Sequence, residues 1–92
     1  MTPPFSVRTI PQFDRLLRRL SRRHRDLAER YTECLAILRA DPYNRSRQRD
    51  ILKLSGVAPE DGGQYRLRLG RFRFRYDIER QEVILYYCGL RR

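Results

Sequence analysis

A chain of 92 residues can form one domain with a modest hydrophobic core, so we expect a single domain over residues 1–92. The sequence has no apolar run near the roughly 20 residues that cross a bilayer and no N-terminal signal pattern, which predicts a cytoplasmic protein without membrane contact. Its 21 Lys and Arg exceed its 11 Asp and Glu, the net charge is +10, and Lys53 is the one lysine. Arginine binds phosphate and carboxylate through paired hydrogen bonds. The excess therefore favours a nucleic acid or an acidic protein as partner, with a bias in codon usage as the alternative explanation.

The chain begins with a predicted strand and an amphipathic helix. Residues 5–9 alternate apolar and polar side chains, a pattern typical of a strand. Thr9, followed by Pro11 and Gln12, predicts a helix start with Thr9 as the capping residue. Apolar residues then recur at helical spacing through residues 13–20. The outer faces of this helix carry arginines that either are solvated or bind nucleic acid: Arg15, Arg18, Arg19, Arg22 and Arg23.

A second helix and several strands complete the predicted fold. The apolar stripe of the second helix consists of Leu27, Tyr31, Cys34, Leu35 and Leu38. This helix should end at Asp41, because the proline that follows disfavours helical geometry there. Residues 51–54 and the almost wholly apolar residues 82–88 read as strands, the latter covered on both faces. We therefore expect an α+β fold, in which an αα-hairpin of two N-terminal helices packs on a mainly antiparallel sheet of about four strands.

A tight turn is predicted within residues 64–78. Apolar residues fall on odd positions in residues 64–69 and on even positions in residues 72–78. One continuous strand cannot bury both sets, because neighbouring residues point to opposite faces. A two-residue turn at Gly70 and Arg71, of the type II′ that glycine favours at its first position, resolves the conflict and makes a hairpin.

The predicted hairpin gathers four arginines on one face. Its register places Arg68 opposite Arg73 and Arg66 opposite Arg75, while leucines and aromatic residues share the other face. Like charges opposite each other weaken a sheet, and the sequence places no carboxylate among these arginines. A solvated face with arginines reaching into water is one interpretation. We favour the other, a site for an external anion.

The residue types limit the chemistry of such a face. Cys34 and Cys88 lack the spacing of metal ligands and His24 stands alone, so we expect buried, reduced thiols and no metal or cofactor. No paired carboxylates and no nucleophile beside a histidine lie near the arginines. Arginine is a poor base because it stays protonated, but it stabilises charge that develops on a phosphate. RNA supplies its own nucleophile, the 2′-hydroxyl, so a face that orients this group could cleave RNA.

Several stretches together resemble a known family. In order and spacing, "FSVRTIPQFDRLLRRL", "DPYN", "KLSG", "YRLRLGRFRFRYDI" and "VILYYCGLRR" are similar to the RelE/ParE superfamily of bacterial toxin–antitoxin toxins, and more closely to RelE-type mRNA interferases. The resemblance covers nearly the whole chain. It implies a compact sheet with two N-terminal helices and cleavage of mRNA on the ribosome by 2′-hydroxyl attack. It also implies an acidic, RelB-like antitoxin as partner.

The resemblance assigns roles to individual residues. By position, Arg66 and Arg68 match the basic pair expected to hold the scissile phosphate. Arg73 matches the arginine that stabilises the transition state, and Arg91 the one at the leaving group. The other residues expected to contact RNA are Arg75, Lys53 and the five arginines of the first helix, Arg15, Arg18, Arg19, Arg22 and Arg23.

Two departures from the family pattern leave alternatives open. RelE often carries lysines at the basic pair, and lysine can lose a proton where arginine cannot, so the identity of the base stays open. The family places a functional tyrosine after the last arginine, whereas this sequence ends at Arg92; Tyr86 and Tyr87 are expected to serve in packing. The alternatives are an inactive or truncated form, a ParE-like protein that poisons DNA gyrase, and a non-catalytic module that binds RNA or docks an antitoxin.

Overall fold

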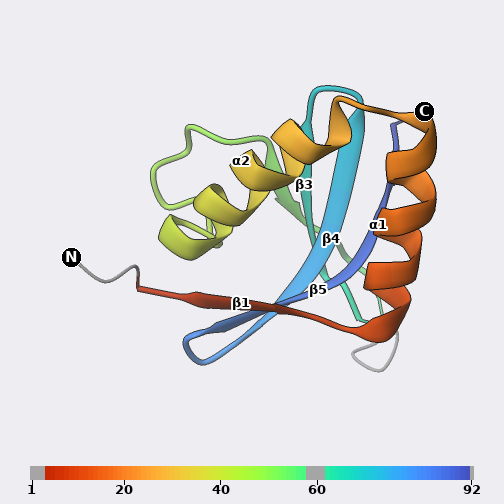
Figure 1. Cartoon of the computed structure of the whole chain (residues 1–92). Helices are drawn as coiled ribbons and strands as arrows, with labels where there is room; N and C mark the ends of the chain where they lie inside the picture. Colours follow the sequence, from red (N-terminus) through yellow and green to blue (C-terminus); the bar gives the residue numbers. More distant parts are fainter. Residues whose placement is uncertain (1–3, 58–61, 92) are drawn as a thin grey trace.

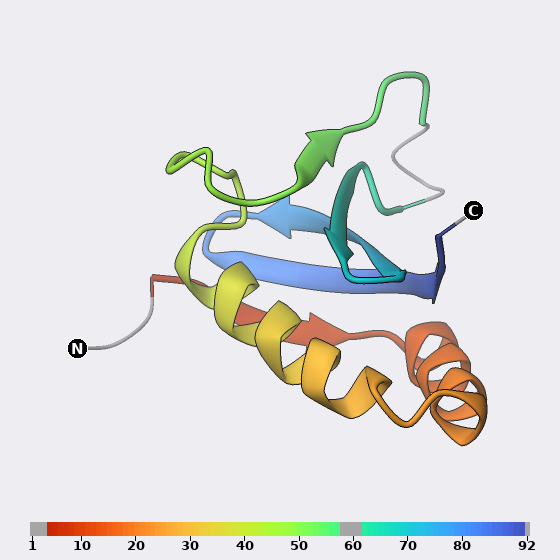
Figure 2. The same ribbon diagram turned by 90° about the horizontal axis from the view of Figure 1, so that it is seen from above.

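Two helices pack on one face of a mixed sheet, as the sequence predicted (Figures 1 and 2). The computed structural model describes residues 4–57 and 62–91. The elements are β1 Ser6–Thr9, α1 Pro11–Arg23, α2 Leu27–Ala40, β2 Ile51–Lys53, β3 Tyr65–Leu69, β4 Phe72–Glu79 and β5 Glu82–Leu90. Their sheet has the order β1-β5-β4-β3-β2, with β1 parallel to β5 and the other pairs antiparallel. The sheet thus has five strands where about four were expected. In the described segments, neither helix is long and apolar enough to cross a membrane.

The helix ends are set by backbone geometry more than by side-chain caps. The predicted capping role of Thr9 is wrong: Ile10 occupies the N-cap of α1 without a side-chain cap hydrogen bond, and Pro11 begins the helix. Thr9 belongs to β1 instead, where it pairs with Leu85. Helix α2 ends at Ala40, and the backbone N–H of Asp41 donates to the carbonyl of Ile37. The end of the helix at this point agrees with the prediction made from the proline that follows Asp41.

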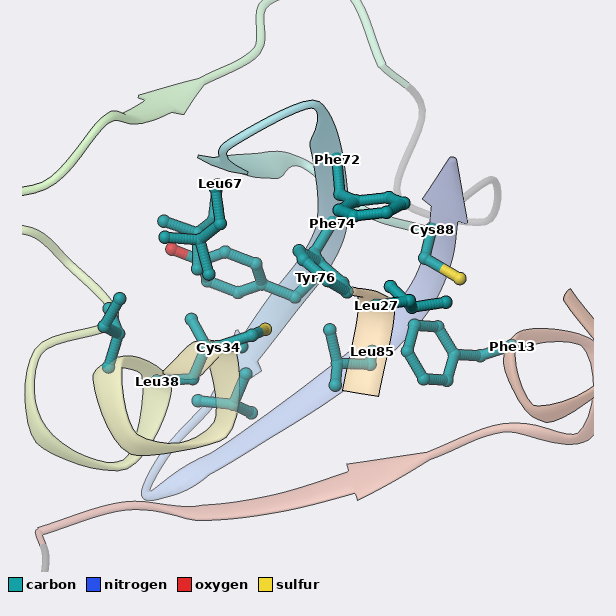
Figure 3. Packing of buried hydrophobic residues seen from close by; sticks show 13 residues of the cluster. Phe13, Leu27, Cys34, Leu38, Leu67, Phe72, Phe74, Tyr76, Leu85 and Cys88 are labelled. Carbon is teal, nitrogen blue, oxygen red and sulfur yellow. The ribbon is translucent and has the colours of Figure 1, made fainter. Parts of the chain in front are cut away.

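The core lies between the helices and the sheet (Figure 3). Its fully buried side chains come from both layers: Phe13, Leu27, Cys34 and Leu38 from the helices, and Leu67, Phe72, Phe74, Tyr76 and Leu85 from the strands. The predicted stripe of α2 omitted Ile37, which is buried, whereas Tyr31 and Leu35 are half-buried. Both cysteines are buried and free, and burial raises the pKa of the Cys88 thiol to about 12.

Strand β5 is a central strand of the sheet and contains a β-bulge. It lies between β1 and β4, and Val83, Ile84 and Leu85 are fully buried, so its predicted buried position is confirmed. The register against β4 shifts between Arg75 and Tyr76, which leaves an extra residue on β5. Such a bulge sharpens the local twist. β1 pairs only with the first half of β5, and α1 packs beside the remainder.

Candidate active site

The hairpin of β3 and β4 has the predicted register. Arg66 is paired with Arg75 and Arg68 with Arg73. Gly70 has φ +58°, the left-handed value that a type II′ turn requires at its first central residue. Because alternate residues of a strand point to opposite faces, all four arginines leave the sheet on the side away from the helices. All four are half-buried.

The side chain of Arg66 is largely covered by its neighbours. It is only 14% exposed. Burial lowers the pKa of the Arg66 guanidinium, and the neighbouring positive charges of Arg68, Arg73 and Arg91 lower it further. The Nε atoms of Arg66 and Arg73 are buried and have no hydrogen-bond partner. A buried N–H without an acceptor costs about 1–3 kcal/mol, so these two groups are unusual in a folded protein.

Arg91 joins the group from the end of β5. Its backbone N–H donates to the carbonyl of Arg71 at 2.7 Å, and its Nη1 donates to the carbonyl of Gly70 at 3.2 Å. Both bonds anchor Arg91 to the hairpin turn, where its positive charge lowers the pKa of the Arg66 guanidinium. The structure therefore brings together the four residues with predicted catalytic roles. We call Arg66, Arg68, Arg73 and Arg91 the arginine cluster.

Arg75 has a different position from the cluster, although it shares the same face. Its Nε donates to the carbonyl of Gly63 at 3.0 Å, and its Nη2 lies 3.5 Å from the carbonyl of Gly62. The next residue, Gln64, donates its backbone N–H to Asp77 at 2.6 Å. These bonds hold residues 62–64 against β4, next to the face of the sheet that carries the cluster. An RNA phosphate would therefore have to compete with these two carbonyl groups for the Arg75 guanidinium.

One carboxylate lies beside the cluster, contrary to the sequence expectation of none. Oδ1 of Asp50 is 3.6 Å from Nη2 of Arg66, and the backbone carbonyl of Asp50 accepts the N–H of Arg68 at 3.0 Å. Asp50 ends the loop that precedes β2, so its approach depends on the path of that loop. Sequence spacing gave no sign of it. Among the described residues, this one carboxylate leaves most of the positive charge of the cluster unbalanced.

The other predicted RNA contacts lie apart from the cluster. Lys53 is paired with Tyr65, whose side chain belongs to the helix-covered face, and Nζ of Lys53 lies 5.7 Å from the centre of that ring. The five arginines of α1 are exposed on the helix surface. Two of them, Arg19 and Arg23, line a groove between α1 and the end of β5. The structure thus offers two basic surfaces, the cluster and the outer side of α1.

The two neighbouring tyrosines of β5 pack against glycines. A Cβ atom at Gly62 would overlap the ring of Tyr86, and one at Gly89 would overlap the hydroxyl end of Tyr87. These contacts support the predicted packing role of both rings. Among the described residues, no three His, Cys, Asp or Glu side chains gather in the way that a metal site requires.

Comparison with known proteins connects this arrangement to one fold. No family model matches the sequence, and no curated protein matches it either. Among solved structures, a chain of the archaeal RelE–RelB complex from Pyrococcus horikoshii OT3 superposes with a TM-score of 0.70. The alignment covers 96% of both chains at 23% identity. This protein has the RelE fold.

Proposed function

We propose that this protein is the toxin of a type II toxin–antitoxin system and cleaves mRNA on the ribosome. The observation that carries the proposal is the arginine cluster: Arg66, Arg68 and Arg73 share one face of the hairpin, and Arg91 is hydrogen-bonded to its turn. Non-bridging phosphate oxygens are the acceptors that arginine pairs with best. A phosphodiester bound to the accessible part of these guanidinium groups would offset the repulsion between them.

The proposed reaction uses groups of the RNA for most of its chemistry. The 2′-hydroxyl gives its proton to a base and attacks the adjacent phosphorus, the bond to the 5′-oxygen breaks, and a 2′,3′-cyclic phosphate remains. Arg66 and Arg68 hold the phosphate oxygens, and Arg73 stabilises the charge that grows on them in the transition state. Arg91 neutralises the departing 5′-oxygen, which takes its proton from water. Holding the nucleophile in line with the leaving group supplies the remaining acceleration.

The surroundings of the cluster suggest how the protein is held on its substrate and silenced. The exposed arginines of α1 would bind ribosomal RNA through phosphate contacts that do not depend on sequence. The similar archaeal structure is a RelE–RelB complex. By analogy, an acidic antitoxin in the cytoplasm would cover the basic surface of this chain until it is degraded.

The proposal is tested by adding the purified protein to translating ribosomes and mapping transcript ends. We expect new 5′ ends within coding regions, and Arg73→Ala should lower the cleavage rate by at least a hundredfold while the affinity for ribosomes changes little. Intact messages at doses that stop growth would reject the proposal. If the protein instead inhibited gyrase supercoiling at a one-to-one ratio, with intact messages, the ParE-like alternative would be correct.

A further inference from the structure

The four arginines of the cluster cannot act as a base, and one carboxylate from residues 4–57 and 62–91 lies beside them. Attack by the 2′-hydroxyl requires that its proton be accepted, and arginine has no lone pair available for this. Oδ1 of Asp50 lies 3.6 Å from Nη2 of Arg66. This distance allows charge attraction but exceeds that of a hydrogen bond. The carboxylate oxygens of Asp50 therefore remain able to accept a proton from a bound hydroxyl.

We propose that Asp50 is the general base of the RNA cleavage reaction, an inference that rests on the proposed function. Its carboxylate accepts the proton of the 2′-hydroxyl as the oxygen attacks phosphorus. The bond from phosphorus to the 5′-oxygen then breaks, that oxygen takes a proton from water, and protonated Asp50 returns its proton to solvent. The ion pair with Arg66 places the base next to the group that holds the phosphate, as the attack geometry requires.

The backbone around Asp50 is fixed on both sides. Nδ2 of Asn44 donates to the carbonyl of Arg49 at 2.8 Å, and Oδ1 of Asn44 accepts the backbone N–H of Arg49 at 3.1 Å. The carbonyl of Asp50 then joins the ladder to β3 by accepting the N–H of Arg68. Asn44 has φ +57°, a left-handed value that asparagine tolerates better than most residues. The loop of residues 41–50 therefore holds Asp50 in place before RNA arrives.

Three other aspartates of the described segments are engaged in hydrogen bonds within the protein. Asp26 accepts two hydrogen bonds from Arg71, and Asp77 accepts the N–H of Gln64 at 2.6 Å. Asp41 accepts hydrogen bonds from the backbone of residues 45 and 46 and from a serine hydroxyl. Asp50 combines nearness to the cluster with free oxygen lone pairs, and its side chain is 54% exposed, so a substrate can reach it.

The inference is tested by single-turnover cleavage of a ribosome-bound message at saturating protein. Asp50→Asn keeps the shape and removes the base, so the rate should fall by about a hundredfold to ten-thousandfold. The affinity for ribosomes should be unchanged or higher, because a negative charge beside Arg66 is lost. Asp50→Glu should keep a measurable share of the rate. Glu29→Gln, at an exposed position of α2, serves as the control and should cleave like the wild type.

A chemical rescue separates a base from a merely structural carboxylate. In Asp50→Ala, added formate should restore cleavage in proportion to its concentration, while chloride at equal ionic strength should not. If Asp50→Asn cleaved at the wild-type rate, or if formate gave no rescue of a folded Asp50→Ala protein, the inference would be wrong although the proposed function stood. If the wild-type protein itself failed to cleave, both would be wrong.

Discussion

Replacing Arg73 by methionine should stabilise the folded protein while it abolishes cleavage. The Nε–H of Arg73 is buried without a partner, a state that costs about 1–3 kcal/mol. Methionine keeps a flexible apolar stem in the same space and has no N–H group. It also removes the repulsion from Arg68, the residue directly opposite. We expect the free energy of unfolding to rise by about 1 kcal/mol, which in a domain of this size raises Tm by about 4–8 °C.

Urea unfolding followed by circular dichroism, at low and at high salt, measures this gain. The part that comes from charge repulsion should shrink at high salt, because exposed charges are then screened. Arg71→Met is the matched control: Nη2 of Arg71 lies 2.6 Å from a carboxylate oxygen of Asp26, so its loss should give no gain. An Arg73→Met protein that unfolds at a lower urea concentration than the wild type would contradict this prediction, since it would mean that the chain itself compensates the Arg73 guanidinium.

Three further predictions concern the arginine cluster, the glycines of the loop before β3, and the core. The affinity for single-stranded RNA should fall linearly with the logarithm of salt concentration, and Arg68→Ala should reduce that slope by about one phosphate contact; an unchanged slope would place Arg68 off the RNA. Gly62→Ala combines φ +68° with overlap of the Tyr86 ring and should cost more than about 1 kcal/mol of unfolding free energy. Gly56→Ala, with φ +75° and open space around it, should cost less in the same urea assay. The two buried cysteines should react with a thiol reagent only as fast as the protein unfolds, and rapid labelling of the folded protein would contradict their burial.

The hairpin could be predicted from the sequence because two local signals agree. The apolar positions change from odd to even across Gly70, and glycine suits the turn that this change demands. Together they fix the register, and the register fixes which arginines share a face. The same logic reaches Lys53, since pairing of residues 51–53 with β3 alternates sides and assigns Lys53 to the helix-covered face and Leu52 to the arginine face. The side of the sheet on which Lys53 lies could thus be predicted from the sequence once β2 is known to pair with β3.

Other features could not be predicted because they depend on contacts between distant segments. Thr9 has the residue type of a helix cap, but the parallel pairing of β1 with β5 keeps it in a strand. Asp50 reaches Arg66 because the loop of residues 41–50 folds on itself around Asn44 and Asp41. Arg75 looks equivalent to its three neighbours in sequence, yet the return of residues 62–64 over the sheet supplies it with acceptors. The path of such a loop leaves no repeating pattern of apolar residues in the sequence, so it cannot be predicted in the way that a helix or strand can.

The most direct test of the account is cleavage of a ribosome-bound message that carries a single 2′-deoxynucleotide at a mapped cleavage site. The arginine cluster is proposed to act on a phosphate that the neighbouring 2′-hydroxyl attacks. We therefore predict that the deoxy message stays intact at that site and binds as well as the normal message, which should end in a 2′,3′-cyclic phosphate. Cleavage at the deoxy site, at a rate near that of the normal message, would contradict the account.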